Sequence, residues 1–134
     1  MSKRRALLVG SDAPVVAILS KFLSHGHHYD VESTDYCDDA LAVLSQQPFD
    51  LMLLLSIFAR WRKLPLRKER FGGIELLKQM RARNIQVPTL VISATLLAQP
   101  KNEALANGAL AFLPEPVNLA ELGEALKKAE ENKR

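Results

Sequence analysis

Side chains that could bind a metal ion or act as nucleophiles follow the ends of several apolar segments in this sequence. Ser11 and Asp12 come after the first such segment, and Ser56 directly follows a run of five apolar residues. Ser93 ends a later segment and Glu115 follows another. Carboxylate and hydroxyl oxygens are the groups that hold Mg²⁺ or attack electrophiles in proteins. The chemistry therefore depends on whether one fold brings these segment ends together.

Short segments typical of strands alternate with segments typical of helices along the whole chain. The apolar run before Ser56 is typical of a central strand that is covered on both faces. Asn118 is placed to cap the last helix, and Gly26 and Gly108 are placed to end two others. Strands are expected at 5–10, 28–34, 50–56, 88–93 and 109–114. Helices are expected at 13–26, 35–47, 72–83, 99–108 and 118–134.

Five strand–helix units in series predict a parallel sheet with helices on both faces and right-handed crossovers. This is a three-layer, doubly wound α/β fold, and its site is expected where the strands end. Those ends carry Gly10–Asp12, Leu55–Ser56, Ser93–Ala94 and Pro114–Pro116. The length of 134 residues is that of one domain, which is expected over 1–134.

Composition predicts a globular protein of the cytoplasm. Hydrophobic residues make up 48% and charged residues 25% of the sequence, which is not the composition of a disordered chain. The longest apolar run is far too short to span a bilayer, and the apolar stretch near the start is too short for a signal peptide. Cys37 is the single cysteine, so no internal disulfide is possible and a reducing compartment is expected.

In order along the chain, these segments resemble the receiver domain of bacterial response regulators. The resemblance rests on the stretches LLVGSDAP, PFDLMLLLS, GGIELLKQMR, VPTLVISA and ALANGALAFLPEPVN. It implies a flavodoxin-like (βα)5 fold with strand order 2-1-3-4-5, and a part in the phosphorelay of a two-component system. Family members pass their signal through the fourth helix, the fifth strand and the fifth helix, which map onto 99–129 here.

The residues that carry phosphoryl transfer in this family are replaced here. The phosphoacceptor aspartate maps onto Leu55, five residues after Asp50, and leucine has no nucleophilic oxygen. The two acidic metal ligands map onto Ser11 and Asp12, so one carboxylate is left and Mg²⁺ binding is not expected. The lysine that contacts the phosphoryl group maps onto Glu115, which reverses the charge. The sequence therefore predicts a pseudo-receiver that is not an enzyme and needs no cofactor.

Two residues of the family's switch are retained by resemblance. Ser93 maps onto the serine or threonine that follows the phosphoryl group, and Phe112 maps onto the aromatic residue that rotates with it. Without a phosphoryl group, the favoured interpretation is that both side chains simply fit their places. Asp12 and Glu115 could share a proton or bind a cation, but two solvated carboxylates are favoured. The histidines of the turn HGHH are expected to favour a helix end and not a metal ion.

A basic insertion at about 60–71 separates the third strand from the third helix. Residues 60–70 carry six basic side chains and one acid, a net charge of +5, so the rest of the chain is faintly acidic. Tryptophan and arginine are frequent at interface hot spots, which favours a protein partner of acidic character. The alternatives are binding of nucleic acid phosphates and a solvated insertion whose tryptophan folds back onto the domain. The candidate contact residues are Arg60, Trp61, Arg62, Lys63, Leu66, Arg67, Lys68 and Arg70.

The favoured function is a non-catalytic module that binds another protein in trans in bacterial signalling. A homodimer through 99–129 is an alternative use of the same surface, and no membrane contact is expected. A different function is that of a response regulator phosphorylated at another carboxylate. A third is that of a nucleic-acid-binding accessory that uses the basic insertion.

Overall fold

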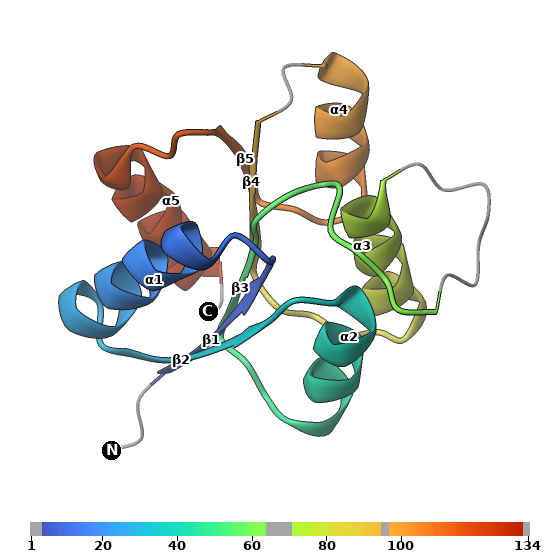
Figure 1. Ribbon diagram of the computed structural model, residues 1–134, viewed down its shortest axis with the longest axis horizontal. Helices are drawn as coiled ribbons and strands as arrows, with labels where there is room; N and C mark the ends of the chain where they lie inside the picture. Colours follow the sequence, from blue (N-terminus) through green and yellow to red (C-terminus); the bar gives the residue numbers. More distant parts are fainter. Residues whose placement is uncertain (1–3, 64–70, 95–96, 133–134) are drawn as a thin grey trace.

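The computed structural model describes residues 4–63, 71–94 and 97–132, and it has a parallel sheet between two layers of helices (Figure 1). The strands are β1 (Arg4–Val9), β2 (Tyr29–Thr34), β3 (Leu51–Leu54), β4 (Thr89–Ser93) and β5 (Ala111–Pro114). The helices are α1 (Ala13–Lys21), η1 (Phe22–Gly26), α2 (Cys37–Gln46), α3 (Gly72–Ala82), α4 (Ala98–Ala106) and α5 (Leu119–Asn132). The strand order β2-β1-β3-β4-β5 confirms the predicted doubly wound α/β fold.

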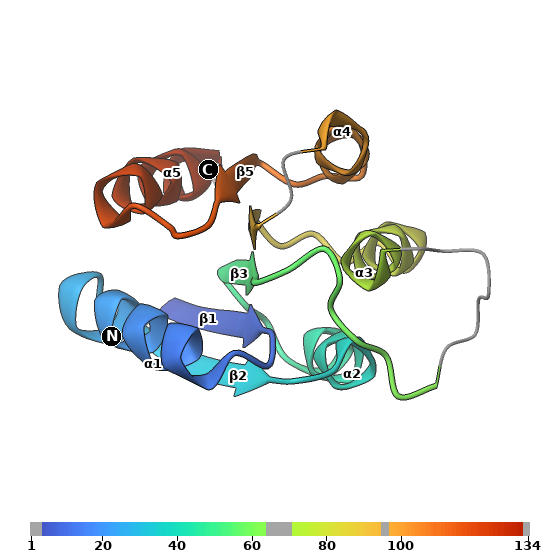
Figure 2. The same ribbon diagram turned by 45° about the horizontal axis from the view of Figure 1, so that its top comes forward.

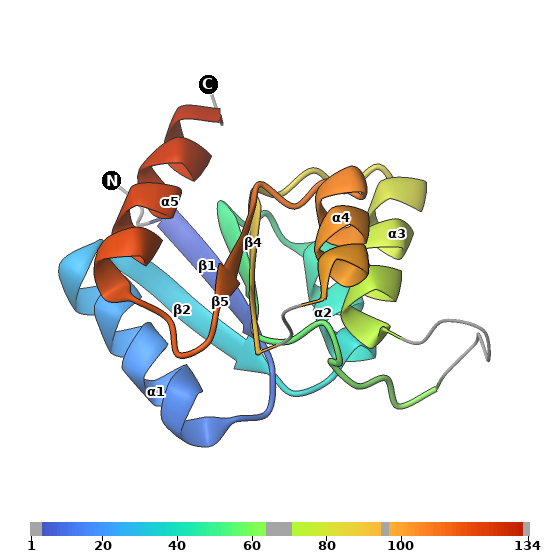
Figure 3. The same ribbon diagram turned by 90° about the horizontal axis from the view of Figure 1, so that it is seen from above.

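Helices cover both faces of the sheet, with α1 and α5 on one face and α2, α3 and α4 on the other (Figure 3). Successive side chains of a strand point to opposite faces, so each face has its own apolar core. In β3, Met52 and Leu54 pack with residues of α2 and α3, whereas Leu51 and Leu53 pack with residues of α1 and α5. Burial on both faces explains why this strand is apolar throughout.

The helix ends follow the capping residues that the sequence supplies, with one difference. The predicted helix 13–26 is divided, because α1 ends at Lys21 and a π-helical turn, η1, continues to Gly26. Asn118 caps α5 as predicted, since its Oδ1 accepts the backbone N–H groups two and three residues further on. Gly108 follows α4 with a φ of 106°, a conformation that favours glycine.

All neighbouring strands are parallel, so their carboxyl ends lie at one edge of the sheet. Figure 2 shows the strands side by side, with β2 and β5 at the outside. Val9 is paired with Leu54, and Ser93 with Pro114. The register therefore brings the segments that follow β1 and β3 next to each other, as the doubly wound fold predicts.

Candidate functional site

A cavity of about 270 Å³ opens at the carboxyl edge of the sheet, where the site is expected. The Leu55 N–H donates to the Val9 carbonyl at 2.9 Å, which fixes the end of β3 beside the end of β1. Four of the residues singled out in the sequence, Ser11, Asp12, Leu55 and Glu115, line this one cavity. The other lining residues are Gly10, Asp35, Ser56, Phe58, Ala59 and Arg60.

Leu55 fills the end of β3 with an apolar side chain. It is 5% exposed and packs in the core on the α1 and α5 side of the sheet. A Cβ atom at Gly10 would stand 2.7 Å from the Leu55 Cβ, closer than two carbon atoms can approach. The two positions are therefore fitted to each other, because Leu55 occupies space that any side chain at position 10 would need.

The polar residues around the cavity hold backbone turns. The Asp12 carboxylate caps α1, since its Oδ1 accepts the Val15 N–H at 3.3 Å. The Ser56 Oγ accepts the Phe58 N–H at 2.9 Å, a local bond typical of serine in turns. Ser11 is exposed. These contacts stabilise the local backbone whether or not the cavity binds anything.

The charge around the cavity is mainly negative. Asp12, Asp35 and Glu115 line it together with a single cation, Arg60. In the described part of the chain none of these three carboxylates forms an ion pair. Among the same residues, no group of three histidine, cysteine, aspartate or glutamate side chains is arranged to hold a metal ion. An anion such as a phosphoryl group would meet repulsion here.

Ser93 and Phe112, the switch-like residues, do not line the cavity. Ser93 is 1% exposed at the end of β4, and its Oγ has no hydrogen-bond partner within the described residues. Phe112 is half-buried on β5 opposite Val91 and packs on the α2, α3 and α4 side. The Glu115 N–H donates to the Ser93 carbonyl at 3.1 Å, so backbone pairing links β4 to the segment that carries Glu115.

The described start of the insertion is bound to the beginning of α2. The Arg60 carbonyl accepts the Cys37 N–H at 2.8 Å, and Arg60 is bridged to Tyr36 as in a parallel sheet. The backbone N–H groups of Arg62 and Lys63 donate to the Asp38 carboxylate at 2.6 and 3.2 Å. Residues 60–63 of the insertion are therefore held against the domain by these hydrogen bonds.

Trp61 is half-buried, packs against the core on this side and donates from Nε1 to the Gly72 carbonyl at 2.9 Å. This favours the alternative in which the tryptophan folds back onto the domain. The Arg62 guanidinium lies 4.2 Å from the centre of the Tyr36 ring and 3.3 Å from the Asp39 carboxylate. Four further candidate contact residues lie outside the described residues, namely Leu66, Arg67, Lys68 and Arg70.

Cys37 lies beneath the insertion and is fully buried. Its Sγ is 3.8 Å from the Gly72 carbonyl. Burial first, and the nearby Asp38 carboxylate second, raise the pKa of the Cys37 thiol to about 12. Because the thiolate is the nucleophile, a thiol with this pKa is unreactive near neutral pH.

Three lining residues, Asp35, Phe58 and Ala59, were not singled out in the sequence. Asp35 directly follows β2. Because all parallel strands end at the same edge, its position after a strand could have placed it at the cavity. Phe58 is 57% exposed and lies edge-on to the Phe71 ring, with the ring centres 5.5 Å apart. That contact joins residues at the two ends of the insertion. No local sequence pattern predicts it.

The parallel sheet, its strand order and a cavity at the carboxyl edge define a receiver-type α/β domain. Residues 6–127 match the family model of the response regulator receiver domain, and the chain belongs to this family. Receiver domains are signalling modules that contact other proteins or domains. No helix in the described part of the chain is long and apolar enough to cross a membrane.

Known proteins of this kind are similar along nearly the whole chain. The transcriptional regulatory protein ZraR of Salmonella typhimurium is 32% identical over 123 residues, 92% of this chain and 25% of that protein. The response regulator protein PilR of Pseudomonas aeruginosa is 29% identical over 129 residues, 96% of this chain and 26% of that protein. This chain thus spans about a quarter of the length of these relatives. The non-phosphorylated HemR receiver domain of Leptospira biflexa has a TM-score of 0.76 at 26% identity, covering 96% of this chain and 94% of that one.

Proposed function

We propose that this chain is a pseudo-receiver that is not phosphorylated at the usual strand end and acts by binding a partner protein. The Leu55 side chain, which is buried at the strand end and has no oxygen, supports this most directly. Attack on phosphorus needs an oxygen nucleophile, and Leu55 offers a buried hydrocarbon. On this proposal, residues 1–134 form one receiver-like domain with a basic insertion at about 60–71.

The charge of the cavity supports the same conclusion. Phosphoryl transfer to a carboxylate relies on Mg²⁺ and on a cation that offset the charge of the phosphoryl oxygens. Here Glu115 lines the cavity where the family resemblance places a lysine, and Asp12 and Asp35 add negative charge. Asp12 is also engaged as the cap of α1. Mg²⁺ binding is therefore not expected, and we propose that the module works without a cofactor.

The partner surface that we propose is the face formed by α4, β5 and α5. Three large apolar side chains are exposed on or next to these elements, Leu105 at 40%, Leu110 at 38% and Leu119 at 41%. Exposed apolar side chains that lie together are typical of interaction surfaces. Of the three, Leu119 lies next to α1, since it lines a cavity with Val15 and Ile18, so Leu105 and Leu110 carry this proposal. The insertion is the second candidate surface, but in its described half Trp61 is packed on the domain and Arg62 is already paired.

The first experiment measures phosphorylation. The purified chain is incubated with acetyl phosphate and Mg²⁺, and its intact mass is measured. We expect no gain of a phosphoryl group, whereas a receiver domain with an aspartate at the strand end gains one under the same conditions. A mass gain that disappears in Asp12→Asn or Asp35→Asn would contradict the proposal and support phosphorylation at another carboxylate.

The second experiment locates the partner surface. Capture from native lysate is compared for the wild type, Leu105→Asp and Arg62→Ala, each with and without nuclease. We expect a protein that is retained after nuclease treatment, lost with Leu105→Asp and kept with Arg62→Ala, because the first change places a charge on the apolar face. Loss with Arg62→Ala alone would assign the contact to the insertion. Capture that depends on nucleic acid would contradict a direct protein contact.

A further inference from the structure

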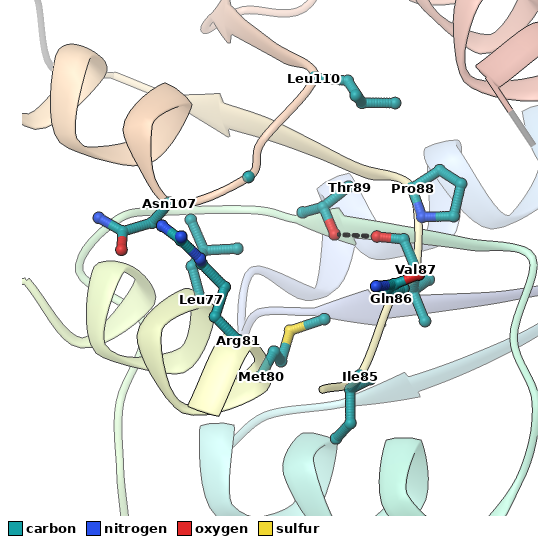
Figure 4. Close-up of a pocket in the computed structure, with 11 residues that line it drawn as sticks. Leu77, Met80, Arg81, Ile85, Gln86, Val87, Pro88, Thr89, Asn107 and Leu110 are labelled. Atoms are coloured by element: carbon teal, nitrogen blue, oxygen red, sulfur yellow. Dashed lines mark hydrogen bonds between the residues drawn. The ribbon is translucent and has the colours of Figure 1, made fainter. Parts of the chain in front are cut away.

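A groove of about 500 Å³ lies at the amino-terminal edge of the sheet, at the opposite end from the cavity beside Leu55. Its walls are the end of α3, the connection from α3 to β4, and the turn between α4 and β5 (Figure 4). Its volume lies in the range of small-molecule sites in proteins. Of its lining residues, the proposed function uses only Leu110.

The lining is mixed, with polar side chains beside apolar ones. Leu77 and Met80 are buried in the core between the sheet and the helices α2, α3 and α4 and form the floor of the groove. Ile85 and Val87 are half-buried against the same core, and Leu110, 38% exposed, lies across from them. A ligand with a hydrocarbon body would remove the exposed parts of Ile85, Val87 and Leu110 from water, which is favourable.

Among the described residues, the lining has one charged side chain, Arg81. Its Nη1 donates to the Ala106 carbonyl at 2.9 Å, and within the described residues the guanidinium forms no ion pair. A guanidinium has five N–H donors, so donors remain for a ligand. Figure 4 shows Arg81 and Asn107 on one side of the groove and Gln86 and Val87 on the other.

The end of α4 does not cancel this positive charge. Unsatisfied carbonyls at a helix end attract cations and repel anions. Here the last four carbonyls of α4, from Glu103 to Ala106, all accept hydrogen bonds. The donors are the backbone N–H groups of Asn107, Gly108 and Ala109, the Asn107 side chain and Arg81. The Arg81 guanidinium is therefore the one formal charge among the described residues that line the groove.

We propose that this groove binds a small amphipathic carboxylate, with its hydrocarbon body on Ile85, Val87 and Leu110 and its carboxylate on Arg81. A guanidinium held by one backbone carbonyl is already oriented, so less side-chain freedom is lost when a carboxylate binds. The ligand would contact both α3 and the turn that leads into β5. Binding would therefore be sensed at Leu110, beside the proposed partner face. The domain could in this way respond to a small molecule without a phosphoryl group.

The test uses two probes of equal chain length and opposite charge, octanoate and octylammonium, at up to about 10 mM, as suits ligands of this size. Binding is followed by the NMR signals of the Leu77, Met80 and Leu110 side chains. We expect octanoate to shift these signals and octylammonium to leave them unchanged. Equal shifts with both probes would mean non-specific contact and overturn the proposal, as would no shift with octanoate.

Matched variants identify the charge responsible. Arg81→Gln should weaken octanoate binding at least about tenfold, because a charge-assisted bond is lost. Arg83→Gln, two residues further on and outside the lining, should change it less than about twofold. Gln86→Glu adds a negative charge to the lining without touching Arg81 or the end of α4, and it should weaken binding as well. Equal losses with Arg81→Gln and Arg83→Gln, or unchanged affinity in Gln86→Glu, would overturn the proposal.

Discussion

The two ends of the parallel sheet carry cavities of opposite charge. At the carboxyl end, Asp12, Asp35 and Glu115 surround a cavity closed by the buried Leu55. At the amino end, Arg81 is the one charged side chain among the described residues that line a larger groove of mixed polarity. The end where this fold usually binds ligands would thus repel anions, and the opposite end has a cation that forms no ion pair within the described residues. A likeness in fold therefore does not fix which end of a sheet is used.

The largest expected effect on stability comes from placing aspartate, the family's phosphoacceptor, at the strand end. Leu55→Asp should destabilise the domain by at least about 3 kcal/mol, because a core side chain is lost and a carboxylate is buried. Urea unfolding measures the change. The control is Leu119→Asp, at an exposed position, which should change the stability by less than about 0.5 kcal/mol. An unchanged stability in Leu55→Asp would mean that the strand end still accepts a carboxylate. The carboxyl end of the sheet would then be less different from a working receiver site than we infer.

The second effect concerns the insertion near the carboxyl-end cavity, where Trp61 packs on the domain without lining the cavity. Trp61→Ala should cost about 2 kcal/mol, since a half-buried indole and its bond to the Gly72 carbonyl are lost. Trp61→Phe keeps most of the packing and should cost about 1 kcal/mol. Equilibrium unfolding of both variants checks this. Arg62→Ala is the neighbouring control, because its ion pair with Asp39 is exposed and contributes little. Equal stabilities for Trp61→Ala and the wild type would show that the indole is not an anchor.

A third effect appears at alkaline pH and concerns Tyr29 and Cys37, which line neither cavity. Burial, followed by charge and hydrogen bonding from Glu130, raises the pKa of Tyr29 to about 12, and the pKa of Cys37 is about 12 as well. Both groups are neutral when protonated, and the folded state holds these protons more tightly than the unfolded state. Their contribution to stability is therefore complete below about pH 9 and is lost as the pH rises toward 12.

Urea unfolding at pH 9 and pH 10 should show a loss of about 1 kcal/mol from the Cys37 thiol, and Cys37→Ala should remove that part of the loss. At pH 8 the thiol should react with iodoacetamide only after unfolding, because the thiolate is scarce in the folded state. Rapid alkylation of the native chain would show that Cys37 is accessible.

Much of the fold follows from the sequence because its signals are local. The apolar run before Ser56 predicts the central strand, and Asn118 predicts the start of α5. The end of α1 at Lys21 was missed, since no residue type distinguishes a π-helical turn from the helix before it. At the site, register predicts that Leu55 lies beside the first strand. The contact of Phe58 with Phe71 spans the insertion, and contacts between residues distant along the chain leave no periodic pattern.

The groove at the amino end illustrates the same limit. Arg81 in α3 and the turn around Gly108 are distant in sequence, and only the packing of α3 beside α4 brings them together. Sequence patterns predict which face of each helix is buried, but not how far apart two helix ends stand. A groove formed by one helix end and two connections therefore has to be seen in the structure.

The smallest effect on stability is expected from Glu115→Lys, which restores the family's charge at the carboxyl-end cavity. Glu115 is exposed and forms no ion pair among the described residues. The new cation would face Asp12 and Asp35, so the change in unfolding free energy should stay within about 0.5 kcal/mol. The control is Glu121→Lys, at an exposed position of α5 outside this cavity.

Restoring the lysine should not restore phosphorylation, because a cation stabilises a transferred phosphoryl group but cannot accept it. The mass of Glu115→Lys after treatment with acetyl phosphate and Mg²⁺ should therefore equal that of the untreated variant. A mass gain in Glu115→Lys but not in Glu121→Lys would place an acceptor carboxylate at the cavity, with Asp12 and Asp35 as the candidates. The carboxyl end would then be a receiver site that lacks only its cation. The two ends of the sheet would still differ in charge, but the carboxyl end would be able to accept a phosphoryl group.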